Sequence, residues 1–116
     1  MSIRRIGAGP RMSTAVVHGN TVYLAGQVAD KTKGASVADQ TKEIVGIIDE
    51  LLMEAGSDKT KVLSATIYLS DISTFPQMNS VWDTWVVPGQ TPARATVEAK
   101  LAAPEYTVEI AVIAAI

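Results

Sequence analysis

The sequence has no cysteine and only one histidine. The lack of cysteine excludes disulfides, thiol nucleophiles and thiolate metal sites. The chain also has no phosphate-binding glycine loop, no HExxH or GxSxG sequence and no His/Cys set with metal-ligand spacing. No metal site is therefore predicted. His18 stands beside a predicted turn without an orienting partner, so it is interpreted as a solvent-exposed residue rather than a catalytic base.

Long apolar runs and strong charge are also missing. No segment is long and apolar enough to span a bilayer, and the N-terminus lacks the apolar core of a signal peptide, so we expect a soluble, cytoplasmic protein without a membrane partner. The 10 basic and 12 acidic residues give a net charge of −2. Only Arg4, Arg5 and Arg11 cluster, which argues against a nucleic-acid partner.

Aromatic residues make up 5% of the chain, although 47% of it is hydrophobic. Trp82 and Trp85, at helical spacing, are interpreted as core or interface residues rather than a stacking platform for bases. The many Ala, Val and Ile residues favour tightly packed strands. A chain of 116 residues can bury its own core, so we expect one domain, 1–116, with further apolar surface buried in an oligomer.

Turn and cap residues divide the chain into elements. Gly19-Asn20 predicts a hairpin between strands at 13–18 and 21–26, after a short edge strand at 3–6. Ser36 and Gly56 are suited to begin and end a helix of about five turns, since Ser can accept a backbone N–H and Gly adopts the left-handed conformation.

A second helix and three more strands follow. Ser73 can cap the helix, with Pro76 in its first turn and Pro88-Gly89 after its end. Alternation predicts strands at 62–70, 91–101 and 106–116. In the first of them the residues on one face are Leu63, Ala65, Ile67 and Leu69. In the second we expect a core face of Ala93, Ala95, Val97, Ala99 and Leu101 and an opposite face, toward water or ligand, of Arg94, Thr96, Glu98 and Lys100.

The order strand, hairpin, helix, strand, helix, strand, strand predicts an α+β fold with both helices on one side of a mixed sheet. The other sheet face then lacks a cover. Because apolar residues of the last strand point toward it, we expect subunits to pack sheet against sheet.

Two charged residues stand out in the last two strands. Glu109 is the only charge in its strand, and a carboxylate in apolar surroundings needs a partner, a proton or a water-lined pocket. Arg94, at the start of the preceding strand, is a candidate neighbour. Arg94 also has a structural interpretation, as a satisfied strand-end arginine, whereas the apolar surroundings of Glu109 favour a functional role about as much as a structural one. Together they would suit a small carboxylate-bearing substrate and one proton transfer.

The motif Pro92-Ala93-Arg94, followed by Val97, Leu101 and Val108-Glu109-Ile110, resembles the C-terminal signature of the Rid/YjgF family of reactive-intermediate deaminases. Gly19-Asn20, Gly26-Gln27, Gln40, Ala55-Gly56, the turn at 71–75 and Asn79 also fall in matching places. The resemblance implies a chorismate-mutase-like fold assembled as a homotrimer around a central β-barrel, with ligand clefts between subunits. It implies hydrolysis of imines and enamines to 2-oxo acids and ammonia without a cofactor.

Carried over to this chain, the resemblance assigns Arg94 to the substrate carboxylate and Glu109 to the water and the proton. Backbone groups near Gly26 and Thr96 would complete substrate binding. The chain departs from the better-known deaminases at Arg11 and Met12, where they carry a Tyr shortly after Gly-Pro, at Ala25 in place of Ser, and at Thr96, where Cys is common. Arg11 is either a solvated loop residue or a second cation in the cleft.

Two other functions stay open at this point. The same clefts could bind a small carboxylate, or serve a chaperone-like role, without turnover. RNA cleavage or translation inhibition, activities attributed to some family members, is disfavoured by the acidic balance and by the lack of an acid/base pair suited to a phosphodiester.

Overall fold

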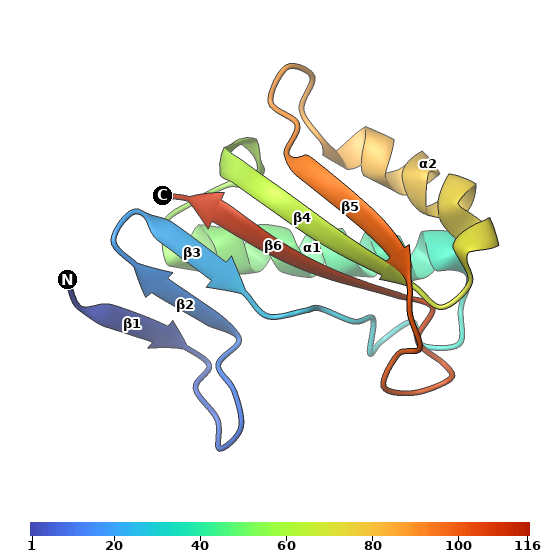
Figure 1. The fold of residues 1–116 in the computed structure, drawn as a ribbon, viewed down its shortest axis with the longest axis horizontal. Helices are drawn as coiled ribbons and strands as arrows, with labels where there is room; N and C mark the ends of the chain where they lie inside the picture. The colour runs from blue at the N-terminus through green and yellow to red at the C-terminus, as the bar shows by residue number, and fades with distance from the viewer.

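Six strands form one mixed sheet, and two helices cover one of its faces (Figure 1). The computed structural model describes all residues, 1–116. The elements are β1 (Ile3–Ile6), β2 (Ala15–His18), β3 (Thr21–Leu24), α1 (Val37–Ala55), β4 (Val62–Leu69), α2 (Phe75–Trp85), β5 (Ala93–Glu98) and β6 (Val108–Ala115). The predicted α+β class and the order of the elements are confirmed.

The strand order is β1-β2-β3-β6-β4-β5. β4 and β5 are parallel because α2 carries the chain back across the sheet between them, whereas all other neighbours are antiparallel. β6 therefore lies between β3 and β4, and β4 separates β6 from β5. Strands that follow each other in the sequence, β5 and β6, are not neighbours in the sheet.

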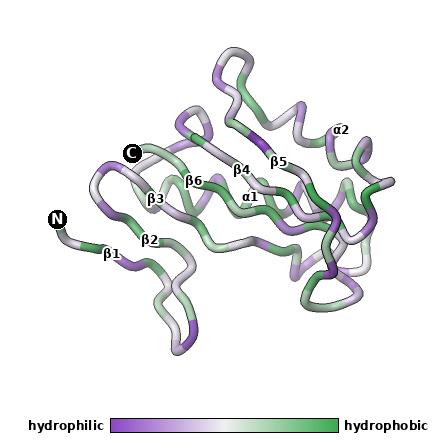
Figure 2. The backbone as a smooth tube through the Cα atoms, viewed as in Figure 1, coloured by the Kyte–Doolittle hydropathy of each residue, from purple (hydrophilic) through white to green (hydrophobic).

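The core lies between the sheet and the two helices. Alternate residues of β6, from Val108 to Ala114, are buried there together with Ile67 of β4 and Ile44 of α1. Figure 2 shows α1 alternating between hydrophilic and hydrophobic residues, as a helix with one solvent face requires, while β6 is largely hydrophobic.

The cap residues of α1 act as predicted. The Ser36 hydroxyl accepts a hydrogen bond from the Asp39 N–H at 3.1 Å, and Gly56 follows the helix with φ of 86°. The prediction for α2 was wrong in one respect. Ser73 lies in a short 3-10 turn, Ile72–Thr74, where its N–H and hydroxyl donate to Asp71, and no side chain caps α2.

The hairpin around Gly19-Asn20 is confirmed. The predicted face of Leu63 was wrong, because β4 has an irregular register between Val62 and Ser64. That irregularity turns Val62 toward the core and leaves Leu63 exposed.

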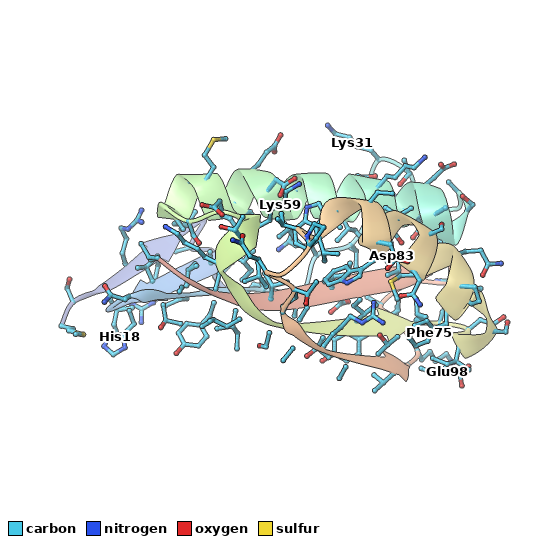
Figure 3. All side chains as sticks on the ribbon, turned by 90° about the horizontal axis from the view of Figure 1, so that it is seen from above. His18, Lys31, Lys59, Phe75, Asp83 and Glu98 are labelled. Carbon is cyan, nitrogen blue, oxygen red and sulfur yellow. The ribbon has the colours of Figure 1, made fainter.

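The second face of the sheet has no covering element. The edge-on view in Figure 3 shows both helices on one side and side chains such as that of His18 projecting from the other. His18 is exposed, as expected. Tyr23 and Ile113, paired across β3 and β6, are partly exposed on this face and keep 46% and 37% of their surface accessible. The chain thus presents an open, partly apolar sheet face.

No helix of the chain has the length and apolar character to cross a membrane.

Candidate functional site

Strand β5 turns its polar side chains toward the helices, which is the reverse of the expected arrangement. Arg94 and Thr96 are paired with the buried residues Ala65 and Ile67 of parallel β4, and side chains of paired residues point to the same face. Ala95 and Val97 are therefore on the open face. The expectation of an apolar core face on β5 was wrong. This strand is at the edge of the sheet, so its helix-facing side chains lie beside α2 at the protein surface and not over the centre of the core.

The Arg94 guanidinium is held by three side chains of α2. Its Nη1 donates to Asn79 Oδ1 at 2.8 Å, and its central carbon lies 5.3 Å from the ring centre of Phe75 and 5.6 Å from that of Trp82. Cation–π contacts of this kind fix a guanidinium while leaving its edge free. Arg94 remains exposed, so its other N–H groups are open to a ligand.

Sequence reasoning assigned no role to these three α2 residues around Arg94. Trp82 was expected in the core or at an interface, and it is indeed buried, with Trp85 at 5.1 Å between ring centres. Its second role, as a wall for Arg94, depends on the parallel β4–β5 pairing. The spacing of Phe75, Asn79 and Trp82 on one helical face was the available signal.

Thr96 lies two residues beyond Arg94 on the same face. Its hydroxyl oxygen is buried and has no hydrogen-bond partner within the chain. Buried hydroxyls are normally paired, so this one is a candidate contact for a bound polar group.

Glu109 lies on the open face of the sheet, opposite Tyr68 of β4. Its carboxylate rests against Gly26: a methyl group at that position would come within 2.3 Å of Glu109 Oε2. Gly26 therefore makes the space that the carboxylate occupies. The following residue, Gln27, exchanges two backbone hydrogen bonds with Ile110, which fixes the Gly26 segment beside β6.

Within one chain, Arg94 and Glu109 are not neighbours, and that expectation was wrong. They extend from opposite faces of the sheet, and β4 lies between their strands. Arg11 lies exposed in the loop between β1 and β2 and makes no hydrogen bond or ion pair that would tie it to either residue. A single chain therefore presents two separate candidate half-sites, one of Arg94, Asn79 and Thr96 and the other of Glu109 and Gly26.

A cavity of about 480 Å³ lies where β4 and β5 end and the chain turns toward β6. The segment 98–104, with Ser70 and Tyr106, lines it. The volume suits a small organic molecule. Phe75 and Glu98 mark the same end of the sheet in Figure 3.

The loop at 29–35 is tied to α1 by Glu43. Its carboxylate accepts from the Thr32 N–H and hydroxyl, both at 2.7 Å, and from the Lys31 N–H at 3.2 Å. Desolvation would raise the pKa of Glu43, but these hydrogen bonds together with the Lys31 charge lower it below its ordinary value. A hydrogen bond from Tyr106 to Asp30 raises the pKa of Tyr106 and joins the same loop to the cavity wall.

The sequence and the fold are similar to those of known proteins. The model of the family described as Endoribonuclease L-PSP matches residues 2–116. A solved structure of a YjgF family member from Neisseria meningitidis is 47% identical, covers 99% of this chain and 95% of its own, and superposes with a TM-score of 0.95. A RutC family protein of Haemophilus influenzae is 46% identical over 98% of both chains.

The chain is thus a small α+β protein with the same fold as the YjgF family structure. It belongs to the YjgF/Rid family. A more distant relative, 33% identical over 88% of this chain and 77% of its own length, is the rat 2-iminobutanoate/2-iminopropanoate deaminase.

Proposed function

We propose that the protein hydrolyses 2-imino acids, and the enamines that tautomerise to them, to 2-oxo acids and ammonia. The observation that carries the proposal is the Arg94 guanidinium, which is fixed by Asn79, Phe75 and Trp82 and yet exposed. The name of the rat relative supports the same reaction class.

Arg94 would bind the substrate carboxylate. Because Nη1 is engaged by Asn79, the Nε and Nη2 N–H groups form the free edge and can donate two parallel hydrogen bonds to the two carboxylate oxygens. Such a bidentate contact fixes the plane of the substrate and so exposes C2 to attack from one side. The Thr96 hydroxyl, unpartnered in the chain, would accept from or donate to the substrate nitrogen.

Glu109 would move the proton. In the proposed sequence its carboxylate takes a proton from water as the water oxygen bonds to C2 and delivers that proton to the imine nitrogen, which gives an amino alcohol. The carboxylate then takes the hydroxyl proton and passes it to the amino nitrogen, so that the C–N bond breaks, ammonia leaves and the C2 oxygen becomes the carbonyl of the 2-oxo acid. The atoms balance as one imine and one water giving one 2-oxo acid and one ammonia.

The two half-sites would meet between chains. Since Arg94 and Glu109 lie on opposite faces of one sheet, a neighbouring chain has to bring its own Glu109 toward Arg94. A homotrimer with open sheet faces turned inward would do this and would also cover Tyr23 and Ile113. A charge introduced there, Ile113→Glu, should lower the mass measured by light scattering to that of one chain. Met53→Glu, on the exposed side of α1, should leave the mass unchanged.

The activity test supplies 2-iminopropanoate, generated in situ by an amino-acid oxidase, and follows semicarbazide trapping and pyruvate release. Wild-type protein should suppress trapping and speed release. Arg94→Ala should lose about 3 kcal/mol of transition-state binding, or roughly a hundredfold in kcat/KM, because a charged bidentate contact disappears. Arg94→Lys serves as the matched control, because lysine keeps the positive charge but cannot donate two parallel hydrogen bonds to one carboxylate. An Arg94→Ala protein as active as wild type would refute the assignment.

The same measurements also distinguish the two other functions, ligand binding without turnover and RNA-directed activity. Calorimetric binding of pyruvate that requires Arg94, without any turnover of the imine, would favour a binding protein. Tight RNA binding at physiological salt would point to the RNA-directed activity instead.

A further inference from the structure

Gln40 is a fully buried polar residue of α1 whose side-chain hydrogen bonds all go to backbone groups outside the helix. Its side chain is 0% exposed. Its Nε2 donates to Ala35 O at 3.1 Å and to Glu105 O at 2.9 Å, and its Oε1 accepts from the Thr107 N–H at 3.0 Å. One amide therefore uses three of its four hydrogen-bonding positions on backbone groups.

Two of these contacts reach the chain just before β6. Glu105 O receives a second hydrogen bond from the Gly34 N–H, and Thr107 O accepts from the Ser70 N–H at 3.1 Å. The backbone of Thr107 is thus held on both sides, by Gln40 and by the end of β4. β6 begins one residue later, and Glu109 is its second residue.

We infer that Gln40 is a positioning residue for Glu109: it fixes the direction in which the chain enters β6 and thereby the placement of the carboxylate against Gly26. The inference rests on the proposed function. Because Gln40 is 0% exposed, it cannot touch a substrate, and it acts only through the backbone.

Thr41 offers a matched control in the same turn of α1. It is also 0% exposed, but its hydroxyl donates to Val37 O, within the helix. Thr41→Val therefore removes a buried hydrogen bond of the same helix without touching the chain that enters β6.

The experiment compares Gln40→Met, Gln40→Glu and Thr41→Val in the full-length protein. In Gln40→Met, amide exchange at Thr107 should accelerate by at least about tenfold and kcat should fall by about tenfold or more, because a catalytic group has lost its fixed position. KM should stay within about twofold, since no contact of Gln40 reaches Arg94. Gln40→Glu keeps the acceptor for Thr107 and should recover part of the lost kcat. Thr41→Val should change neither value.

An unchanged kcat in Gln40→Met with a freed Thr107 amide would overturn the inference. So would an equal loss of kcat in Thr41→Val, which would mean that general destabilisation is the cause. If the wild type turns over no imine, the proposed function fails separately. The effect of Gln40 on the position of Glu109 is then tested by NMR. The side-chain chemical shifts of Glu109 should change in Gln40→Met and not in Thr41→Val, and unchanged shifts in Gln40→Met would refute the inference.

Discussion

Gly26→Ala provides a direct test of whether the position of the Glu109 carboxylate matters. The added Cβ would lie 2.3 Å from Glu109 Oε2 and 3.0 Å from its Cδ, while the other close atom is also part of Glu109. The carboxylate must therefore retreat by about 1 Å to restore ordinary contact. It can do so because Glu109 is only half-buried, on an uncovered face.

Gly26→Ala is expected to have a small effect on stability and a large effect on activity. A displaced rotamer costs about 0.5–1.5 kcal/mol, which corresponds to a decrease in Tm of a few degrees for a chain of this size. A displacement of about 1 Å in a group that moves a proton can lower kcat by roughly a hundredfold. We therefore expect a folded Gly26→Ala protein with a much lower kcat and an almost unchanged KM, because the mutation does not reach Arg94.

The assay is pyruvate release from 2-iminopropanoate, with thermal unfolding measured in parallel. Gly46→Ala is the control: Gly46 is exposed in the middle of α1, and a Cβ there meets no atom within 4 Å. It should raise the free energy of unfolding by about 0.5–1 kcal/mol and leave kcat unchanged. A Gly26→Ala protein with wild-type kcat, in a crystal structure where Glu109 has moved, would refute the reasoning.

Three further predictions concern stability. Ile67→Ala, at a fully buried position, should lower the free energy of unfolding by about 2–5 kcal/mol in urea titrations, and a loss below 1 kcal/mol would contradict the core assignment. Gly56→Ala should destabilise by about 1 kcal/mol, because φ is 86° there; calorimetry showing no change would argue against the cap. Glu43→Gln should lower Tm at pH 7 but not near pH 3. The depressed pKa of Glu43 makes its contribution complete above the ordinary value of 4.5, and the contribution is lost as pH falls through the lower folded value. A Tm difference independent of pH would refute this.

Much of the fold could be predicted because the residues that form turns and helix ends act on neighbours close to them in the sequence. Gly19 and Asn20 specify a tight turn, and Ser36 and Gly56 mark the ends of α1 through groups within a few residues of each other. Such contacts need no knowledge of the rest of the chain.

The faces of β5 could not be predicted, because alternation says which side chains share a face but not which face meets the helices. The decisive facts are the parallel pairing of Arg94 with Ala65 and the nearness of α2, both of which join distant segments. For the same reason, the interpretation of Arg94 as a candidate neighbour of Glu109 within one chain was wrong. Strands consecutive in sequence usually lie side by side, and here β4 intervenes.

The central place of β6 has a consequence for how the chain folds. β3 and β4 share no ladder with each other, and β6 provides the only hydrogen-bonded link between the strands on either side. The hairpin of early strands and the β4–α2–β5 unit can each form from local contacts, but the sheet is incomplete until the last strand inserts between them. Pairing over such sequence separations is slow, so the insertion of β6 between β3 and β4 should be the final step of folding. Until then the edges of β3 and β4 are unpaired and can pair with strands of other chains.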